Sequence, residues 1–294
     1  MSMRKQFVQT AARLLEQDER VVLLLGDIGV FGFRDAFRDF PDRVYNIGIL
    51  EQATVSLAAG LAKTGLVPIV HTIAPFLTER CLEQIKIDFG YQGLGGNFVT
   101  VGASYDYAAL GCTHHCPGDV EVMRSIPGME VVVPGSAKEF DSLLGAAYSS
   151  PQPTYYRLSE ADNSQSPDAG FGQAAVVKQG SKAVVVAVGP MLKAVMEAAE
   201  GLDVTVLYYA TVAPFDAATL KTHASRKILL CEPYYRGGLV AEITEALWPE
   251  PVLVRCVGVP RKFLTNYGRM AEHDTALGFT PEAIRKDLEL LIHA

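Results

Sequence analysis

Short, almost continuously apolar runs alternate with amphipathic stretches along most of the chain. In residues 3–18, the side chains of Phe7, Leu14 and Leu15 share one face at helical spacing. The run VVLLLGD at 21–27 follows, and its short apolar character is typical of a strand buried on both faces. Repetition of this pattern predicts a parallel sheet with helices covering both of its faces.

The alternation predicts a first unit that ends near residue 159. Its expected helices are 3–18, 49–65, 76–90, 120–127 and 137–150, and its expected strands are 21–27, 43–48, 67–73, 97–103, 129–135 and 153–159. Gly65 is expected to end the helix 49–65, because glycine readily adopts the left-handed conformation required there.

A second alternating unit follows a change in composition. Residues 160–173 are rich in Ser, Asp, Gly and Pro, which is typical of a linker. The tail 280–294 has the pattern of an amphipathic helix that begins with Thr-Pro. We therefore predict an α/β protein with two doubly wound, mostly parallel-sheet domains. The predicted first domain is 1–162, the linker 163–177 and the second domain 178–294.

The composition and charge of the chain argue against some classes of binding partner. The chain has 294 residues, of which 49% are hydrophobic and 20% charged, as in soluble globular proteins. Its formal net charge of −7 argues against a nucleic-acid surface. The N-terminal stretch lacks the apolar core of a signal peptide, and apolar runs such as 183–189 are too short to cross a bilayer. We expect neither nucleic acid nor membrane as a partner.

The cysteines are odd in number and widely spaced. They are Cys81, Cys112, Cys116, Cys231 and Cys256. Free thiols fit a reducing cytoplasm, which is the expected location. Cys112 and Cys116 enclose two histidines and so suggest a metal site. An ordinary structural role is favoured instead, because no second pair of ligands lies at the spacing typical of zinc sites.

One acidic residue contrasts with its surroundings. Glu51 lies near the front of NIGILEQATVSLAAGLAKTG, at 46–65, and the residues that follow it are mostly small or apolar. Burying a carboxylate is costly unless it is paired or protonated. Taken alone, the residue is best explained as a negative charge that complements the positive end of a helix dipole.

Three further stretches follow Glu51 in a fixed order. They are HTIAPFLTER at 71–80, LGCTHHCPGD at 110–119 and VEVMRSIPGMEVVVP at 120–134. Together with NIGILEQ, they resemble the C-terminal two-thirds of the transketolase family of thiamin diphosphate enzymes. That family carries GIxEQ or GIxEH, then TFxxF, then THH or THQ, then MRxxPNMxVxxP. The resemblance covers essentially the whole chain and implies the family's pyrimidine-binding and C-terminal domains.

The resemblance implies chemical roles for several residues. Glu51 would share a proton with N1′ of the aminopyrimidine of thiamin diphosphate. An apolar setting raises the pKa of a carboxyl group, which lets such a group hold or share a proton. Phe76 would stack on the aminopyrimidine ring. Ile73, which replaces a family phenylalanine, and Ile49 would line the same pocket. His114 would donate a hydrogen bond to a substrate oxygen or move its proton.

Substrate binding is expected to involve the N-terminus. The resemblance matches Arg4 to a phosphate-binding arginine, whereas His115 is a weaker substrate candidate than its neighbour. Glu160 stands where the family has a second phosphate-binding arginine, and Arg157 precedes it on a predicted strand. ASYDY, at 103–107, replaces a loop that usually contains histidine. We expect sugars or sugar phosphates as substrates, and these departures favour a modified one, amino-substituted or unphosphorylated.

The resemblance also implies a second subunit. In the family, Gly-Asp-Gly followed at a distance by Asn holds a metal ion against the cofactor's diphosphate, and this signature does not occur here. We therefore expect an N-terminal transketolase subunit to carry the diphosphate and Mg²⁺ (or Ca²⁺) site. Self-dimerisation of this chain would give an α2β2 heterotetramer. CEPYYRGG, at 231–238, resembles a family stretch expected to pack in the dimer.

These observations predict the C-terminal subunit of a two-component transketolase, which moves a two-carbon ketol unit from a ketose to an aldehyde. The nearest alternative is the β subunit of a 2-oxoacid or acetoin dehydrogenase, but NIGILEQ with CTHH favours transketolase. A deoxyxylulose-phosphate synthase is less favoured because it is usually one chain. A non-catalytic subunit that retains the fold is the alternative from another class, and Glu51 and His114 argue against it.

Overall fold

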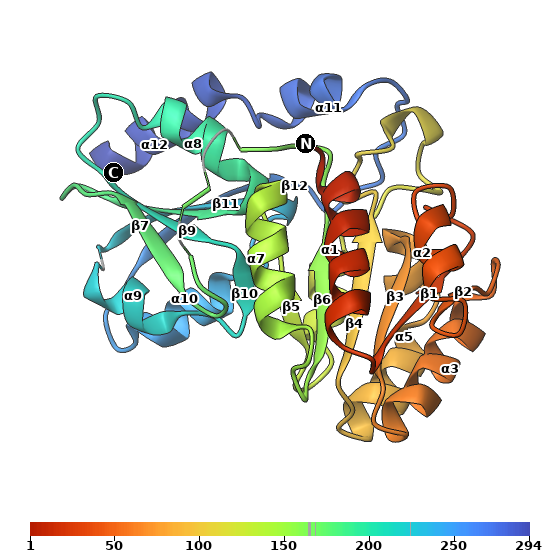
Figure 1. Cartoon of the computed structure of the whole chain (residues 1–294). Coiled ribbons are helices and arrows are strands. Elements are labelled where there is room, and N and C mark those ends of the chain that lie inside the picture. The colour runs from red at the N-terminus through yellow and green to blue at the C-terminus, as the bar shows by residue number, and fades with distance from the viewer. Residues whose placement is uncertain (164–165, 168, 224) are drawn as a thin grey trace.

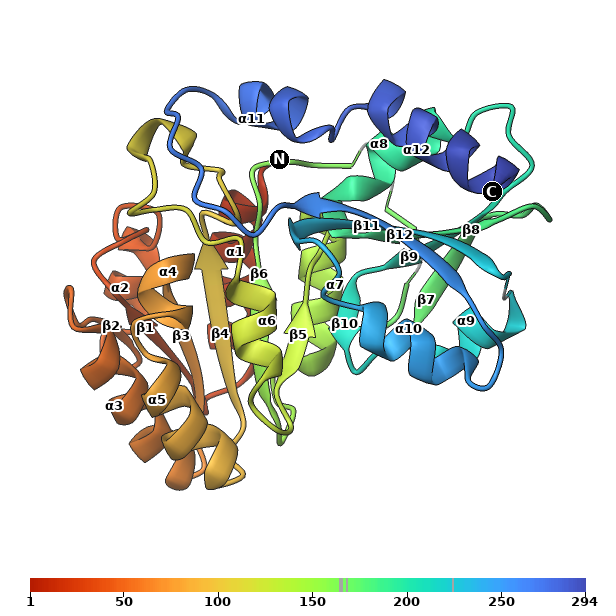
Figure 2. The same cartoon turned by 180° about the vertical axis from the view of Figure 1, so that it is seen from behind.

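The structure is a computed structural model of the chain, and it describes residues 1–163, 166–167, 169–223 and 225–294. Two β-sheets lie side by side, and helices cover both faces of each (Figures 1 and 2). No helix within these ranges is long and apolar enough to span a membrane.

Helices and strands alternate along both halves of the chain. The N-terminal half contains α1 (Met3–Gln17), β1 (Val21–Leu25), α2 (Arg34–Asp39), β2 (Val44–Asn46), α3 (Glu51–Lys63), β3 (Val67–Ile73), α4 (Ala74–Thr78), α5 (Leu82–Gln84), a π-helical segment (Ile85–Tyr91), β4 (Gly96–Val101), a 3₁₀ turn (Ala108–Leu110), α6 (Asp119–Arg124), β5 (Glu130–Val132), α7 (Ala137–Ala147) and β6 (Pro153–Arg157). The C-terminal half contains β7 (Ala174–Lys178), β8 (Val184–Val188), a 3₁₀ turn (Gly189–Met191), α8 (Leu192–Ala198), β9 (Thr205–Tyr209), β10 (Thr211–Ala213), α9 (Ala217–Thr222), β11 (Lys227–Tyr235), α10 (Val240–Leu247), β12 (Leu253–Val259), α11 (Met270–Leu277) and α12 (Pro281–His293).

Most neighbouring strands are parallel, as the sequence predicted. Across the described residues, the first sheet has the order β10-β5-β6-β4-β3-β1-β2, and the second has the order β12-β11-β8-β9-β7. β10 pairs antiparallel with β5, and β7 pairs antiparallel with β9. The other pairs are parallel. The predicted α/β class with two mostly parallel sheets is therefore confirmed.

β1 illustrates why the central strands are continuously apolar. Successive side chains of a strand point to opposite faces of its sheet. Val21, Leu23 and Leu25 belong to one hydrophobic cluster together with the buried face of α1, and Val22 and Leu24 belong to another together with the buried face of α3. Because helices cover both faces, each position of the strand has to be apolar.

The predicted helix 76–90 is broken in the structure. α4 begins at Ala74, before the predicted start, and has Pro75 in its first turn. Proline is favoured there because the first turn of a helix does not need its missing N–H. α4 ends at Thr78, and α5 and the π-helical segment follow separately. The break places Arg80 between α4 and α5, which the apolar spacing of the segment did not reveal.

Short edge strands also differ from the prediction. β7 includes residues 174–177, which fall within the predicted linker 163–177, so the second sheet begins before residue 178. β10 comprises three residues and crosses from the C-terminal half to the edge of the first sheet. Such strands are too short or too exposed to show the apolar run of a central strand.

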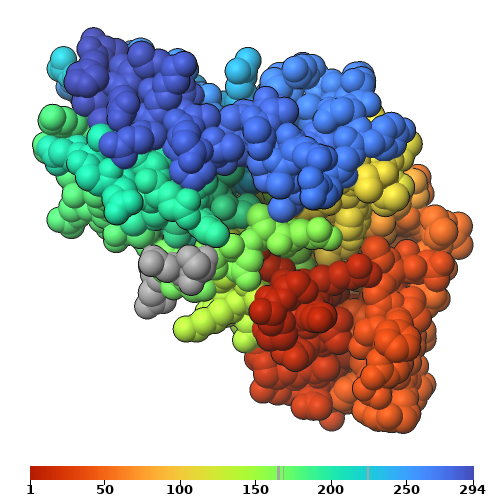
Figure 3. Space-filling model, turned by 90° about the horizontal axis from the view of Figure 1, so that it is seen from above, coloured from red at the N-terminus to blue at the C-terminus, as the bar shows by residue number. Residues whose placement is uncertain are grey.

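The C-terminal segment returns across the top of the molecule. α12 lies over the second sheet, whereas α11 lies beside the loop that follows β4, at the junction of the two halves (Figures 1 and 3). The hydroxyl of Tyr105 in that loop donates to Asp274 Oδ1 at 2.6 Å, and its ring stacks on His273 with a centroid distance of 5.1 Å. The loop after β4 is therefore held by both halves of the chain.

A buried carboxyl group links the two halves at another point. Glu139 on α7 accepts hydrogen bonds through Oε2 from the backbone N–H of Gly135 at 2.6 Å and from the hydroxyl of Tyr208 on β9 at 2.5 Å. Burial raises the pKa of Glu139 to about 7, although both hydrogen bonds act in the opposite direction. The folded protein therefore favours the protonated form of this group.

We expect Glu139→Gln to make stability less dependent on pH. Because the pKa is raised in the folded state, the contribution of the protonated carboxyl group is complete below about 4.5 and is lost as pH rises through about 7. The unfolding free energy of the wild type, relative to the variant, should fall by roughly 1–3 kcal/mol over this range. Urea unfolding at several pH values measures this difference.

Comparison of the wild type with the variant also removes the contributions of other titrating groups to the pH dependence of stability. Burial raises the pKa of Asp106 and of Glu232 to about 7 as well, and both groups are present in the two proteins. Their effects cancel in the difference. A difference in unfolding free energy that stays constant between pH 4.5 and 8 would contradict the assignment to Glu139.

Candidate active site

Glu51 is the first residue of α3, and its carboxylate is buried. The side chain is 3% exposed, and Arg80 donates from Nη1 to Oε2 at 2.7 Å. The ion pair compensates for much of the cost of burial. Within the described residues, the second carboxylate oxygen, Oε1, is buried and has no hydrogen-bond partner. One oxygen is thus held by the protein, and the other is available to a ligand.

Arg80 also contacts the aromatic residue that the sequence analysis selected. Its guanidinium carbon lies 4.4 Å from the ring centroid of Phe76, which is on α4 and half-buried. A guanidinium group is planar and stacks favourably on an aromatic face. The sequence analysis missed Arg80. Its spacing of four residues from Phe76 was an available signal, because such a spacing brings side chains together on one face of a helical turn.

His114 lies on the other side of Phe76. The two rings meet edge to face with a centroid distance of 5.4 Å, and the ring of Tyr107 is 6.4 Å from that of His114. Nδ1 of His114 is 3.0 Å from the hydroxyl oxygen of Thr113, and the side chain is half-buried. The structure therefore brings Glu51, Phe76 and His114 into one continuous group of contacts.

The two isoleucines assigned to the cofactor pocket differ in their surroundings. Ile49 lies in the loop directly before α3 and is 69% exposed. Ile73 ends β3, directly before α4, and is half-buried near Gly102 and Tyr107. Both flank the elements that carry Glu51 and Phe76, and their role in cofactor binding stays a prediction.

Arg4 and Glu160 line a common cavity of about 290 Å³. Arg4 projects from the first turn of α1, and Glu160 follows β6. Asp106 and Tyr107, from the loop after β4, form another part of the wall. Since Tyr107 also contacts His114, the cavity adjoins the group of side chains around Glu51.

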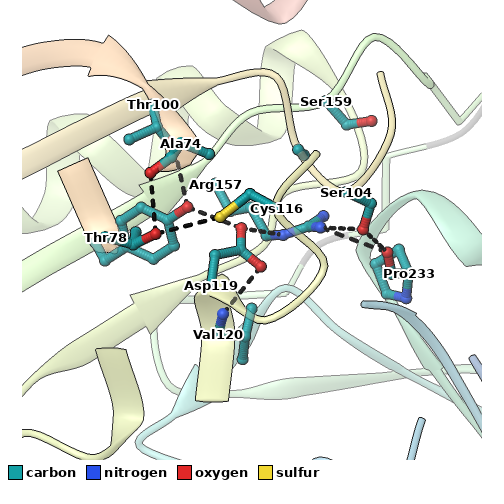
Figure 4. A network of polar contacts seen from close by, with 12 residues as sticks. Ala74, Thr78, Thr100, Ser104, Cys116, Asp119, Val120, Arg157, Ser159 and Pro233 are labelled. Atoms are coloured by element: carbon teal, nitrogen blue, oxygen red, sulfur yellow. Dashed lines mark hydrogen bonds and ion pairs between the residues drawn. The ribbon is translucent and has the colours of Figure 1, made fainter. Parts of the chain in front are cut away.

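Arg157 lies apart from this cavity in a buried polar network (Figure 4). Its side chain is 1% exposed. Nε donates to Asp119 Oδ2 at 2.7 Å, and Nη2 donates to Ser104 Oγ at 2.6 Å. Ser104 in turn donates to the backbone carbonyl of Pro233, in the C-terminal half. The network joins the two halves of the chain, whereas binding of substrate by Arg157 stays an untested prediction.

Asp119 is the buried counter-charge of Arg157. It is the first residue of α6 and is completely buried, and Gly118 occupies the capping position. Besides Arg157, the hydroxyl of Tyr155 donates to Asp119 Oδ2 at 2.9 Å. The carboxylate is directed mainly toward these partners because the buried guanidinium group requires a counter-charge.

His115 and His71, the other histidines near the site in the sequence, are buried and contact residues other than Phe76. His115 is 7% exposed and packs against His273 with a centroid distance of 5.7 Å. Burial, with smaller contributions from His273 and His114, lowers the pKa of His115. Nδ1 of His71 is 2.8 Å from the backbone oxygen of Val99, and burial lowers the pKa of His71 to about 4. His71 is thus a core residue in the structure.

The two cysteines of the CTHHC stretch differ in solvent exposure. Cys112 is exposed, whereas Cys116 is buried, with Sγ 3.3 Å from the hydroxyl oxygen of Thr78. Within the part of the chain that the structure describes, no group of three or more His, Cys, Asp or Glu side chains is arranged to hold a metal ion.

Comparison with known proteins identifies the family. Residues 1–164 match the model of the transketolase pyrimidine-binding domain, and residues 172–284 match the model of the transketolase C-terminal domain. These two domains, with the motifs around Glu51, define the class of protein. The chain belongs to the transketolase family.

Relatives of similar length align with nearly the whole chain. The chain is 38% identical to the "Uncharacterized 33.6 kDa protein in fasciation locus" of Rhodococcoides fascians, over 96% of this chain and 92% of the relative. It is 31% identical to a subunit of the apulose-4-phosphate transketolase of Phocaeicola vulgatus, over 96% and 95%. A solved split-gene transketolase, an inactive β4 tetramer, superposes with a TM-score of 0.86 at 26% identity, over 100% and 98%.

The group of residues around Glu51 fits the aminopyrimidine of thiamin diphosphate. Oε1 of Glu51 is buried without a partner in the described structure, so it can share a proton with a ring nitrogen. The half-buried ring of Phe76 lies in the same group of contacts and suits a planar ligand. Arg80 holds Oε2 in place and thereby fixes the direction in which Oε1 points.

We expect the side chains of Glu51 and Arg80 to be energetically coupled. Arg80→Ala should reduce the free energy of unfolding by about 1–2 kcal/mol, because it leaves the buried carboxylate without its counter-charge. Glu51→Gln should remove most of that penalty in the double variant. Urea unfolding of the two single variants and the double variant gives the coupling energy directly.

An exposed ion pair supplies the control for this cycle. Arg38 pairs with Asp35 on the surface of α2, and both side chains are more than half exposed. Arg38→Ala should leave the unfolding free energy unchanged within error, because water screens exposed charges. Strict additivity of the Glu51 and Arg80 substitutions would refute the coupling.

Proposed function

We propose that this chain is the C-terminal subunit of a two-component, thiamin-diphosphate-dependent transketolase. It would transfer a two-carbon ketol unit from a ketose to an aldehyde. The buried Glu51 carboxylate, with one oxygen paired to Arg80 and one without a partner in the described residues, is the observation that carries this proposal. The name of the Phocaeicola vulgatus relative supports the same reaction class.

Several residues of this chain would each have a separate role in the reaction. Thiamin diphosphate, when bound, supplies the electron sink for carbon–carbon bond cleavage. Glu51 Oε1 would hold or exchange the proton at N1′ of the aminopyrimidine, while Arg80 keeps the carboxylate in position. Phe76 would orient the ring by stacking. His114, on the other side of Phe76, would donate to a substrate oxygen and move its proton.

A partner subunit would complete the site. We propose that it carries the diphosphate and Mg²⁺ or Ca²⁺ site, in a cytoplasmic α2β2 assembly in which this chain also dimerises. Exposed apolar side chains support this proposal: Ile49 and Leu50, directly before Glu51, are 69% and 59% exposed, and Phe31, in the loop after β1, is 81% exposed. Large apolar side chains gathered at a functional site are typical of surfaces that other chains cover.

Calorimetry tests the shared site. Thiamin diphosphate with Mg²⁺ is titrated into this chain alone and into its mixture with the protein encoded beside it. We expect binding only in the mixture. Glu51→Gln should then reduce ketol transfer at least about 100-fold while the subunits still assemble, because proton transfer to the cofactor is lost.

Glu16→Gln, at the exposed C-terminal end of α1, is the matched control and should retain full activity. Tight cofactor binding to the lone chain would contradict the shared site. Full ketol transfer by the Glu51→Gln enzyme would contradict the role of Glu51. Transfer to a lipoyl domain in place of an aldehyde would favour a dehydrogenase β subunit.

The two neighbouring histidines are expected to differ in their effect on the rate. His114→Asn should lower kcat about 10- to 100-fold without changing cofactor affinity, because it removes a group that moves a proton at the substrate. His115→Asn should change kcat less than about threefold, because that ring is buried against His273. Steady-state kinetics and calorimetry on the assembled enzyme measure both quantities. The reverse order of effects would overturn the assignment.

A further inference from the structure

The cavity beside Tyr107 contains opposing charges that the reaction chemistry does not use. It is about 290 Å³ in volume and is lined by Arg4, Asp106, Tyr107 and Glu160, among others. Tyr107 contacts His114, which would face the reacting carbon atoms. A substrate that reaches past His114 would therefore place its far end in this cavity.

Asp106 fixes the position of Glu160 in the cavity wall. Its Oδ2 accepts from the backbone N–H of Glu160 at 3.0 Å and from that of Ala103 at 3.1 Å, and its Oδ1 accepts from the hydroxyl of Ser159 at 3.1 Å. The loop after β4 and the segment after β6 are thus tied together at the cavity. Glu160 remains exposed, and its side chain has no ion pair or hydrogen bond among the residues that the structure describes.

The charges in this cavity disfavour a terminal phosphate. Arg4 alone would attract one, because a guanidinium group binds phosphate well. Glu160 carries the opposite charge on the same wall, and the carboxyl group of Asp106 lies beside it. A phosphate ester would bring two further negative charges against the Glu160 carboxylate, and repulsion between like charges opposes binding. A neutral hydroxyl group can instead donate to a carboxylate and accept from a guanidinium group.

We propose that this cavity binds the far end of an unphosphorylated sugar, and that Glu160 selects against phosphate. The inference rests on the proposed function and narrows its substrate class. Glu160 would accept a hydrogen bond from the terminal hydroxyl group, and Arg4 would donate to a neighbouring sugar oxygen. The opposite charges of Glu160 and Arg4 would then balance each other around a neutral ligand.

Matched acceptors test the proposal on the assembled enzyme. Hydroxypyruvate serves as donor, because transfer of its ketol unit to an aldehyde gives a ketose and releases CO₂, which is measured. D-ribose is compared with D-ribose 5-phosphate, and glycolaldehyde serves as an acceptor too short to reach the cavity. We expect kcat/KM for ribose to exceed that for ribose 5-phosphate at least about tenfold.

Substitution of Glu160 should shift this preference. Glu160→Arg should move the ratio of the two kcat/KM values toward the phosphate ester by about 100-fold, and Glu160→Gln by about tenfold. Because each ratio is compared with the wild type, differences in the free aldehyde content of the two sugars cancel. Glu160→Gln keeps the test valid where Glu160→Arg fails to fold.

Glu16→Arg introduces the same change of charge as Glu160→Arg, but on α1 and away from the cavity. It lies twelve residues from Arg4, which corresponds to roughly 18 Å along a helix. This variant should leave the ratio unchanged, so an equal shift in it would overturn the role of Glu160.

The remaining outcomes separate this inference from the proposed function. Release of CO₂ with glycolaldehyde, combined with a wild-type preference for ribose 5-phosphate, would overturn the inference and leave the proposed function intact. An unchanged ratio in both Glu160 variants would do the same. Absence of CO₂ release with every acceptor, in an enzyme that binds thiamin diphosphate, would overturn the proposed function and the inference together.

Discussion

A carboxylate is stable inside a protein only when a cation or several hydrogen-bond donors compensate for the water that it loses. Among the residues that the structure describes, Glu51 meets this requirement through Arg80 and by way of a single oxygen. That arrangement connects α3 with the break between α4 and α5, and the guanidinium group in turn covers Phe76. The cation that compensates one buried charge therefore also links the acid to the aromatic ring, and through that ring to the adjoining His114.

Hydrogen bonds that involve charged side chains hold the loop after β4 in place at several points. Ser104 connects the buried Arg157 to the C-terminal half, Tyr105 bonds to Asp274 on α11, and Asp106 binds the backbone after β6. Three successive residues thus anchor the loop in three directions. Such anchoring restricts the motion of the segment that leads to His114 and lines the cavity, which suits a site that must position a substrate.

Features that depend on a pattern repeated along the chain could be predicted from the sequence. A side chain whose partner is distant in the sequence could not be placed in this way. The central strands carry continuous apolar runs, so the two sheets were predictable. Glu51 was conspicuous because it is a charge in apolar surroundings. Arg80 is one of many surface-type residues in the sequence, and only the fold brings it to Glu51. Likewise, the pairing of Arg157 with Asp119 depends on packing between β6 and α6 that no local spacing encodes, whereas the predicted role of Arg157 in substrate binding stays a prediction.

The charges proposed to act in catalysis and those proposed to select the substrate lie in separate places. Glu51 and Arg80 form one compensated pair at the start of α3, while Arg4 and Glu160 face a cavity on the far side of Tyr107. Substitutions at residue 160 alter the charge of the cavity without removing a partner from the buried carboxylate. Buried ion pairs tolerate the loss of one member poorly, whereas exposed charges are replaced at little cost in stability. In the proposed enzyme, substitutions at the cavity would therefore change the sugar substrate, while the mechanism proposed for Glu51 would be retained.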